Sequence, residues 1–237
     1  MRVTSARLAC IALAFVTSAP ASAGDLWGGS IGAVSDYVYR GITQTRGKPA
    51  LQLGLYRDFG SGWSLGAWSS PVDYGKRIDA SYELDLSLTR SWLLAEHWSA
   101  RVAYTHYFYP GERGDYDYDE WAASLTYRDR LTATVAVSPN LSLYAYGHTA
   151  WRELATSYEL AAVQPLSARW SITGGAGHYD LRELFGTGYW FWSFGLAFSW
   201  EGLQLDILHI ATDSTAEHLF GEEQAGRRVS ASVVWRF

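Results

Sequence analysis

The segment 80–89 alternates without interruption between apolar and polar residues, and this pattern limits the possible folds more than any other feature of the chain. Successive side chains of a β-strand point to opposite faces, so a period of two predicts a strand with one apolar and one polar face. The same alternation recurs along 98–108, 121–127, 190–200 and 229–237. The chain is therefore expected to be an all-β protein.

The whole chain accommodates about twelve such strands, and ten would fit nearly as well. The weakest are 131–144, which contains Pro139, and 203–212, where Leu208 and Ile210 break the alternation. The expected strands cover residues 26–40, 50–59, 63–72, 79–91, 98–109, 118–127, 131–144, 153–165, 170–181, 189–200, 203–212 and 227–237.

Short and long connections alternate between these strands. The expected turns are 60–62, 93–97, 128–130, 166–169 and 201–202, and the connections between them are mostly longer and richer in charge. Short turns at one end and longer loops at the other are typical of outer-membrane barrels. The predicted fold class is all-β, a transmembrane antiparallel up-and-down β-barrel.

The N-terminal residues have the order of a secretory signal peptide. Arg2 and Arg7 precede an apolar run from residue 8 to residue 16, which ends at the small residues 19–23. This order predicts cleavage after Ala23. The apolar run is shorter than the roughly 18 residues that a membrane-spanning helix needs. We therefore expect a cleaved signal peptide at residues 1–23 and one barrel domain at residues 24–237.

Composition narrows the classes of partner. The formal net charge is −5, and cleavage after Ala23 would remove basic but no acidic residues, so nucleic acid is not an expected partner. The single cysteine, Cys10, lies in the expected signal peptide, and the sequence predicts no cofactor. The 12 tryptophans and 16 tyrosines suit a membrane interface, where barrels carry girdles of aromatic rings.

The last expected strand ends on Trp235, Arg236 and Phe237. This aromatic ending resembles the signal that the barrel-assembly machinery of Gram-negative bacteria reads. Together with the signal peptide, it predicts a location in the cell outer membrane. The expected partners are outer-membrane lipid and lipopolysaccharide, the assembly machinery during biogenesis, and small polar solutes.

Two segments near the start of the barrel, V-S-D-Y-V-Y-R-G-I-T-Q at 34–44 and G-K-P-A-L-Q-L-G at 47–54, resemble the TorF-type porins, a proteobacterial family of unknown function. The resemblance spans essentially the whole mature chain. Pro71 departs from it, since the family usually has a small polar residue there. The resemblance implies a barrel in the outer membrane, and it supplies no substrate and no catalytic residue. Later positions that fit the pattern are Gly66, Trp68, Ser69, Asp73, Glu83 and Asp85.

If the apolar faces meet lipid, the opposite faces bring charged residues into the barrel. Because such charges orient polar solutes and select ions by sign, the leading prediction is a narrow channel for passive diffusion of small polar or ionic solutes. The alternative is a closed structural or ligand-binding barrel in which the charges pair, since barrels of about eight strands are filled by side chains. The candidate pore-lining residues are Asp36, Arg40, Gln44, Asp73, Glu83, Asp85, Arg101, Glu120, Glu159, Asp206 and Arg236.

Asp36, Arg40 and Gln44 also have a second interpretation. Gly41 and Gly47 lie among them as turn residues, so these polar side chains could instead cap backbone groups where a strand ends and the chain turns.

An outer-membrane hydrolase is the less favoured alternative, with His106 and His178 as the available bases. Hydrolysis needs a nucleophile or activated water beside a base that a third group orients. The chain contains neither a G-x-S-x-G elbow nor two histidines at metal-ligand spacing, so we predict no catalytic and no metal-binding residue. The acidic segment 111–120 lacks the ligand order of a calcium loop and is expected to be a solvated outer loop.

Overall fold

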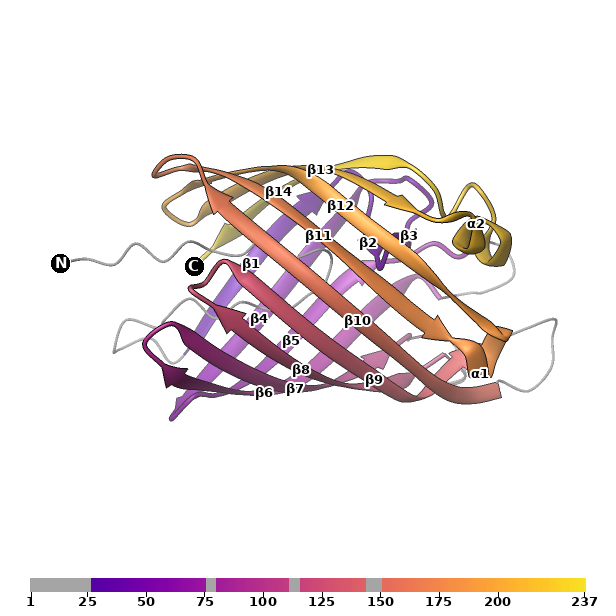
Figure 1. The fold of residues 1–237 in the computed structure, drawn as a ribbon, viewed down its shortest axis with the longest axis horizontal. Coiled ribbons are helices and arrows are strands. Elements are labelled where there is room, and N and C mark those ends of the chain that lie inside the picture. The colour runs from indigo at the N-terminus through magenta and orange to yellow at the C-terminus, as the bar shows by residue number, and fades with distance from the viewer. Residues whose placement is uncertain (1–26, 76–79, 111–115, 144–150) are drawn as a thin grey trace.

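The computed structural model describes residues 27–75, 80–110, 116–143 and 151–237. Twelve antiparallel strands close into one barrel, in which β1 pairs with both β4 and the last strand, β14 (Figure 1). This closure confirms twelve strands rather than ten. The wall consists of β1 (Trp27–Val34), β4 (Ala50–Gly60), β5 (Trp63–Pro71), β6 (Tyr82–Ala95), β7 (Trp98–Phe108), β8 (Tyr118–Tyr127), β9 (Leu131–Leu143), β10 (Trp151–Pro165), β11 (Trp170–Leu181), β12 (Thr187–Trp200), β13 (Leu203–Thr212) and β14 (Arg228–Arg236). The expected signal peptide lies outside the described residues.

The first expected strand, 26–40, was predicted too long. β1 ends at Val34, and at Ser35 the chain leaves the wall while two hydrogen bonds still join it to Ala231 of β14. Residues 38–39 and 42–43 form the separate short strands β2 (Val38–Tyr39) and β3 (Ile42–Thr43). The apolar residues of this stretch resemble a continuation of the wall strand in the sequence. In the structure they are instead buried inside the barrel rather than turned outward.

In two other strands the pairing contains irregularities. β6 spans 82–95 instead of 79–91, and a register shift against β7 near Leu93 lets it continue to Ala95. β9 passes through Pro139 because the pairing with β10 shifts there, so that Ser138 pairs with Ala155 while Leu141 pairs with Glu153. A bulge of this kind accommodates a proline, which has no N–H for the ladder.

The two ends of the barrel have different connections. Tight turns lie at the end where the C-terminus is found, and the turn from β8 to β9 places Arg128 and Asp129 at φ values of 52° and 53°, as in a hairpin turn of type I′. The helices α1 (Arg182–Phe185) and α2 (Ser214–Phe220) lie at the opposite end (Figure 1). The predicted alternation of short turns and longer loops is confirmed. Neither of these helices is long and apolar enough to cross a membrane.

Apolar side chains cover the outside of the barrel. On β6, for example, Tyr82, Leu86 and Leu88 are exposed, while the intervening Glu83 and Asp85 are buried. This is the reverse of a water-soluble barrel. The outward residues with the largest exposure include Leu51, Leu53, Leu55, Trp121, Trp190, Phe194, Ile207, Val229 and Trp235.

Aromatic residues divide by type between the two faces. Most tryptophans point outward, as expected of interfacial girdles, and Trp68 is an exception at 9% exposure. Many tyrosines point inward instead, so the tyrosine content does not serve the girdles alone. The buried tyrosines are Tyr37, Tyr107, Tyr109, Tyr118, Tyr179 and Tyr189.

Candidate functional site

The connection between β1 and β4 folds into the barrel and forms the candidate functional site. We call residues 35–49 the inward hairpin, because its strands β2 and β3 pair inside the wall (Figure 1). Its two-residue turn is Arg40 and Gly41, which have φ values of 48° and 82°. Both values lie in the left-handed region that such a turn requires, and Gly41 adopts it without steric cost.

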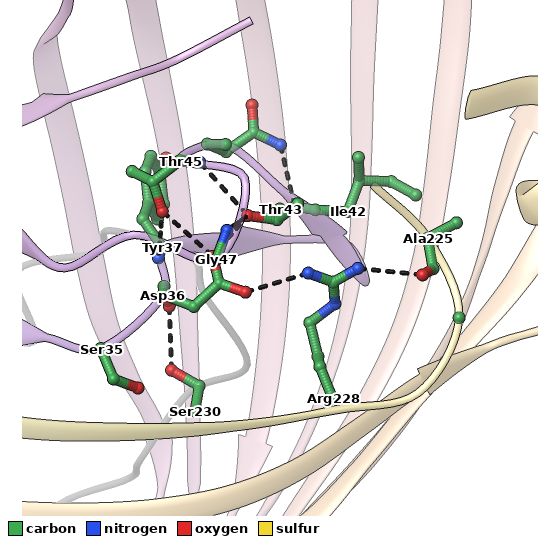
Figure 2. Close-up of polar contacts among 12 residues, drawn as sticks. Ser35, Asp36, Tyr37, Ile42, Thr43, Thr45, Gly47, Ala225, Arg228 and Ser230 are labelled. Atoms are coloured by element: carbon green, nitrogen blue, oxygen red, sulfur yellow. Dashed lines mark hydrogen bonds and ion pairs between the residues drawn. The ribbon is translucent and has the colours of Figure 1, made fainter. Parts of the chain in front are cut away.

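Asp36 fixes the root of the inward hairpin (Figure 2). Its Oδ1 accepts hydrogen bonds from the hydroxyls of Thr43 and Thr45, and its Oδ2 accepts one from Arg228 Nη1 at 2.9 Å. Ser230 Oγ donates to the Asp36 carbonyl at 2.9 Å. Because Arg228 and Ser230 belong to β14, the carboxylate ties the two strands of the hairpin to each other and to the barrel wall.

Arg40 fixes the tip of the inward hairpin to the far wall. Its Nη1 and Nη2 donate to the two carboxylate oxygens of Glu120 on β8 at 2.9 and 3.1 Å, and its Nε donates to Glu159 on β10 at 3.0 Å. The guanidinium also lies 4.6 Å from the ring centroids of both Tyr39 and Tyr179. Bidentate pairing and ring stacking suit the planar guanidinium group and fix its orientation.

Further wall residues orient this ionic cluster. Ser138 donates to Glu120 at 3.1 Å, and Ser157 donates to Glu159 at 2.7 Å. The hydroxyl of Tyr189 donates to the Arg40 carbonyl at 3.0 Å. The tip is therefore held through both its side chain and its backbone, by residues from several strands.

Glu83 and Asp85 lie on the inward face of β6 beside the hairpin. Glu83 accepts hydrogen bonds from the hydroxyls of Tyr37 at 2.7 Å and Tyr109 at 2.8 Å. Asp85 is equally buried, with 5% exposure, but its Oδ1 has no hydrogen-bond partner among the described residues. Two carboxylates on neighbouring inward positions thus differ sharply in how well they are satisfied.

Gln44 and Asp73 lie at the outer side of the hairpin. Gln44 accepts a hydrogen bond from the Tyr74 hydroxyl at 2.8 Å, and Asp73 accepts one from Lys48 Nζ at 2.6 Å. The Lys48 hydrogen bond, aided by the Gly75 N–H, lowers the pKa of Asp73 below its usual value. Lys48 is largely exposed, so this pair links two loops at the surface.

The remaining candidates also face inward, but they lie nearer the end of the barrel that carries the tight turns. Asp206 on β13 accepts hydrogen bonds from Gln204 Nε2 at 3.0 and 2.9 Å, and Arg236 donates to Gln204 Oε1 at 2.8 Å. Arg101 lies on the inward face of β7 near its start. The structure therefore gathers Asp36, Arg40, Glu83, Asp85, Glu120 and Glu159 around the hairpin, and it leaves Arg101, Asp206 and Arg236 apart.

Sequence reasoning missed Arg228, Thr43 and Thr45, which complete the root of the hairpin. The parity of the last strand does place Arg228 on the same face as Arg236, so its inward direction was available from the pattern. The two threonines gave no signal, because their role depends on the fold of the hairpin itself.

The two histidines considered for hydrolysis lie on the outward face. His106 Nδ1 is 2.9 Å from Asp119 Oδ1, which also accepts a hydrogen bond from the Tyr104 hydroxyl, and His178 packs against the Trp190 ring at 4.9 Å. Neither imidazole bonds to a serine or threonine hydroxyl in the described part of the chain. Within those same residues, no group of three or more His, Cys, Asp or Glu side chains is placed to hold a metal ion.

A closed barrel with an apolar outer face, a polar inner face and a loop folded into its interior defines the porin-like class of β-barrel. The sequence matches, over residues 18–237, the family described as "Bacterial protein of unknown function (Gcw_chp)", and the chain belongs to this family. That description does not carry the TorF-type name, so the resemblance to TorF-type porins stays a prediction.

The fold is similar to that of solved porins. The KdgM porin matches with a TM-score of 0.56 at 7% sequence identity, covering 89% of this chain and 99% of that chain. The NanC porin matches with a TM-score of 0.57 at 9% identity, covering 88% of this chain and 97% of that chain. No curated protein matches the sequence. At such low identities, the similarity shows the fold alone.

Proposed function

We propose that the protein is an outer-membrane channel through which small polar or ionic solutes diffuse passively past the inward hairpin. The observation that carries this proposal is a hairpin held across a charged interior, within a barrel whose outer face is apolar. A closed sheet satisfies its own backbone hydrogen bonds, which hydrocarbon requires, and lipid would cover the outward leucines and tryptophans. The export signal expected at residues 1–23 supports the same location.

The charges around the hairpin favour cations. Among the described residues, the acidic side chains there are Asp36, Glu83, Asp85, Glu120 and Glu159, whereas the guanidinium groups are Arg40 and Arg228. An excess of one sign in a confined space of low dielectric attracts counter-ions and repels ions of the same sign. We therefore propose a preference for cationic over anionic solutes.

The same excess argues against polyanionic solutes. A second structure of the KdgM porin, described as a complex with disordered oligogalacturonate, matches with a TM-score of 0.52 at 7% identity. Oligogalacturonate carries a carboxylate on each sugar unit, so the acidic surroundings of the inward hairpin would repel it. The proposal is accordingly a channel whose solutes do not include polyanions of this kind.

A closed barrel is the second candidate, and the pairing around Arg40 favours it. The guanidinium satisfies both Glu120 and Glu159, and buried tyrosines pack beside them, so the hairpin could fill the interior. In either case the protein acts without catalytic residues. Its proposed partners are outer-membrane lipid, lipopolysaccharide and, during biogenesis, the barrel-assembly machinery.

Conductance through planar bilayers separates these candidates. We expect the refolded barrel to give discrete current steps. Under a salt gradient, we also expect the reversal potential to have the sign of a cation-selective channel. The control is protein that has not folded into a barrel and therefore cannot insert into the bilayer. Folded barrels that insert and give no steps would support the closed barrel, and anion selectivity would contradict the charge assignment.

A further inference from the structure

Asp85 is a buried acidic side chain beside which the described residues place no compensating cation. The residue is 5% exposed, and its Oδ1 has no hydrogen-bond partner among the described residues. A buried polar atom without a partner costs free energy, and an unpaired carboxylate costs more. Glu83 and Glu120 increase the negative potential at this site. Within the described part of the chain, no positively charged donor bonds to Asp85 Oδ1.

Aromatic rings flank Asp85 on both neighbouring strands. In the register of the sheet, Asp85 lies opposite Trp68 on β5 and opposite Tyr107 on β7, and residues that are directly paired point to the same face. Tyr37 packs edge-on against Trp68 with centroids 5.3 Å apart, and Tyr118 stacks on Tyr107 with centroids 4.3 Å apart. Both flanking rings are thus fixed in place beside the carboxylate.

The next inward positions toward the tight turns carry small side chains. These are Ser87 on β6, Gly66 on β5 and Thr105 on β7. A Cβ added at Gly66 would come within 2.7 Å of Ser87 Oγ, so the wall is lined closely by backbone and hydroxyl groups there. Bulky side chains surround Asp85 on the side of the hairpin, and small ones on the side of the turns.

We propose that Asp85, between Trp68 and Tyr107, is a binding site for the charged head of a small organic cation that carries N–H donors, such as an alkylammonium or guanidinium group. The N–H would donate to Asp85 Oδ1, and the faces of the rings would attract the positive charge. A metal ion fits less well, because the described residues offer no group of metal ligands here. The inference deepens the proposed function, on which it rests for the route to the site.

Calorimetry on the detergent-solubilised barrel tests the site, with methylguanidinium chloride as the probe. We expect binding by the wild type and about a tenfold loss of affinity in Asp85→Asn, since a charge-assisted hydrogen bond is lost. The matched control is Asp206→Asn, which removes the same charge from another inward carboxylate that already has Gln204 and Ser232 as partners. Absent binding to the wild type, or equal loss in both variants, would overturn the proposal.

The wild-type barrel offers a second test that does not depend on variants. Methylguanidinium should bind more tightly than acetamide, which has N–H donors without charge, and than tetramethylammonium, which has charge without N–H donors. Equal binding of the neutral amide would overturn the proposal. Binding without current steps would refute the channel and leave the site, whereas steps without binding would refute the site and leave the channel.

Discussion

At the scale of single residues, ion pairs between residues that are distant in the chain hold the interior of the barrel together. Arg40 meets Glu120 and Glu159, which lie 80 and 119 positions away. The guanidinium is 2% exposed, so the ion pairs gain from weak screening but also carry a large desolvation cost. Such a cluster fixes the position of the hairpin more than it adds net stability, because the desolvation cost offsets much of the gain from pairing. Each charge is nevertheless costly when its partner is removed.

Arg40→Gln tests this dependence. The substitution leaves Glu120 and Glu159 without a cation, and removing one partner of a buried pair costs about 3–5 kcal/mol. We expect that loss in the free energy of unfolding, measured by tryptophan fluorescence in denaturant, together with stronger cation selectivity. The control is Arg46→Gln, since Arg46 pairs with Glu223 at the surface, where an ion pair contributes about 0–1 kcal/mol. Similar losses in both variants would contradict the role of Arg40.

Gly41 and Gly47 form a matched pair for a second prediction. Both have positive φ, at 82° and 73°, so alanine is strained at either position. Only at Gly41 would an added Cβ also meet the wall, 2.4 Å from Thr212 Cγ2 and 2.9 Å from Phe191 Cβ. Overpacking typically costs about 1–3 kcal/mol, so Gly41→Ala should lose that much more stability than Gly47→Ala in thermal unfolding. Equal losses would mean that the hairpin tip moves freely.

At the scale of elements, the sequence predicts the wall strands better than the inward hairpin. Period-two alternation identifies most wall strands locally, because lipid and the interior select opposite faces. Residues 35–40 carry a similar pattern, yet their apolar side chains pack inside the barrel, and no local signal separates the two cases. For the same reason, parity predicted that Glu120 and Glu159 point inward, but not that both meet Arg40.

Deleting the inward hairpin should leave the wall intact. Val34 and Ala50 pair directly between β1 and β4, so an Asn-Gly turn can replace residues 35–49. We expect unchanged strand content by circular dichroism and a severalfold larger single-channel conductance, because the hairpin no longer crosses the interior. Replacing α1 by glycine and serine, which leaves the hairpin in place, is the control. A deletion variant that conducts no better than the wild type would show that other side chains limit passage.

At the scale of the whole molecule, the two faces of the wall should respond oppositely to the same charge. Leu88 is 43% exposed on the outer face, between Leu65 and Tyr104, while the adjacent Ser87 faces inward beside Gly66. An arginine on the lipid face of a barrel costs about 2–4 kcal/mol near the middle of the bilayer, but in the interior it meets carboxylates and polar groups.

We therefore expect Leu88→Arg to make folding into liposomes less favourable by about 2–4 kcal/mol, whereas Ser87→Arg folds nearly as well as the wild type. Ser87→Arg should instead shift the reversal potential toward anions, because it adds positive charge to the acidic interior. Folding yields in liposomes and bilayer recordings measure the two effects separately. Equal folding penalties at these neighbouring positions would mean that lipid does not cover the outer face, since only a bilayer makes the two environments so different for one side chain.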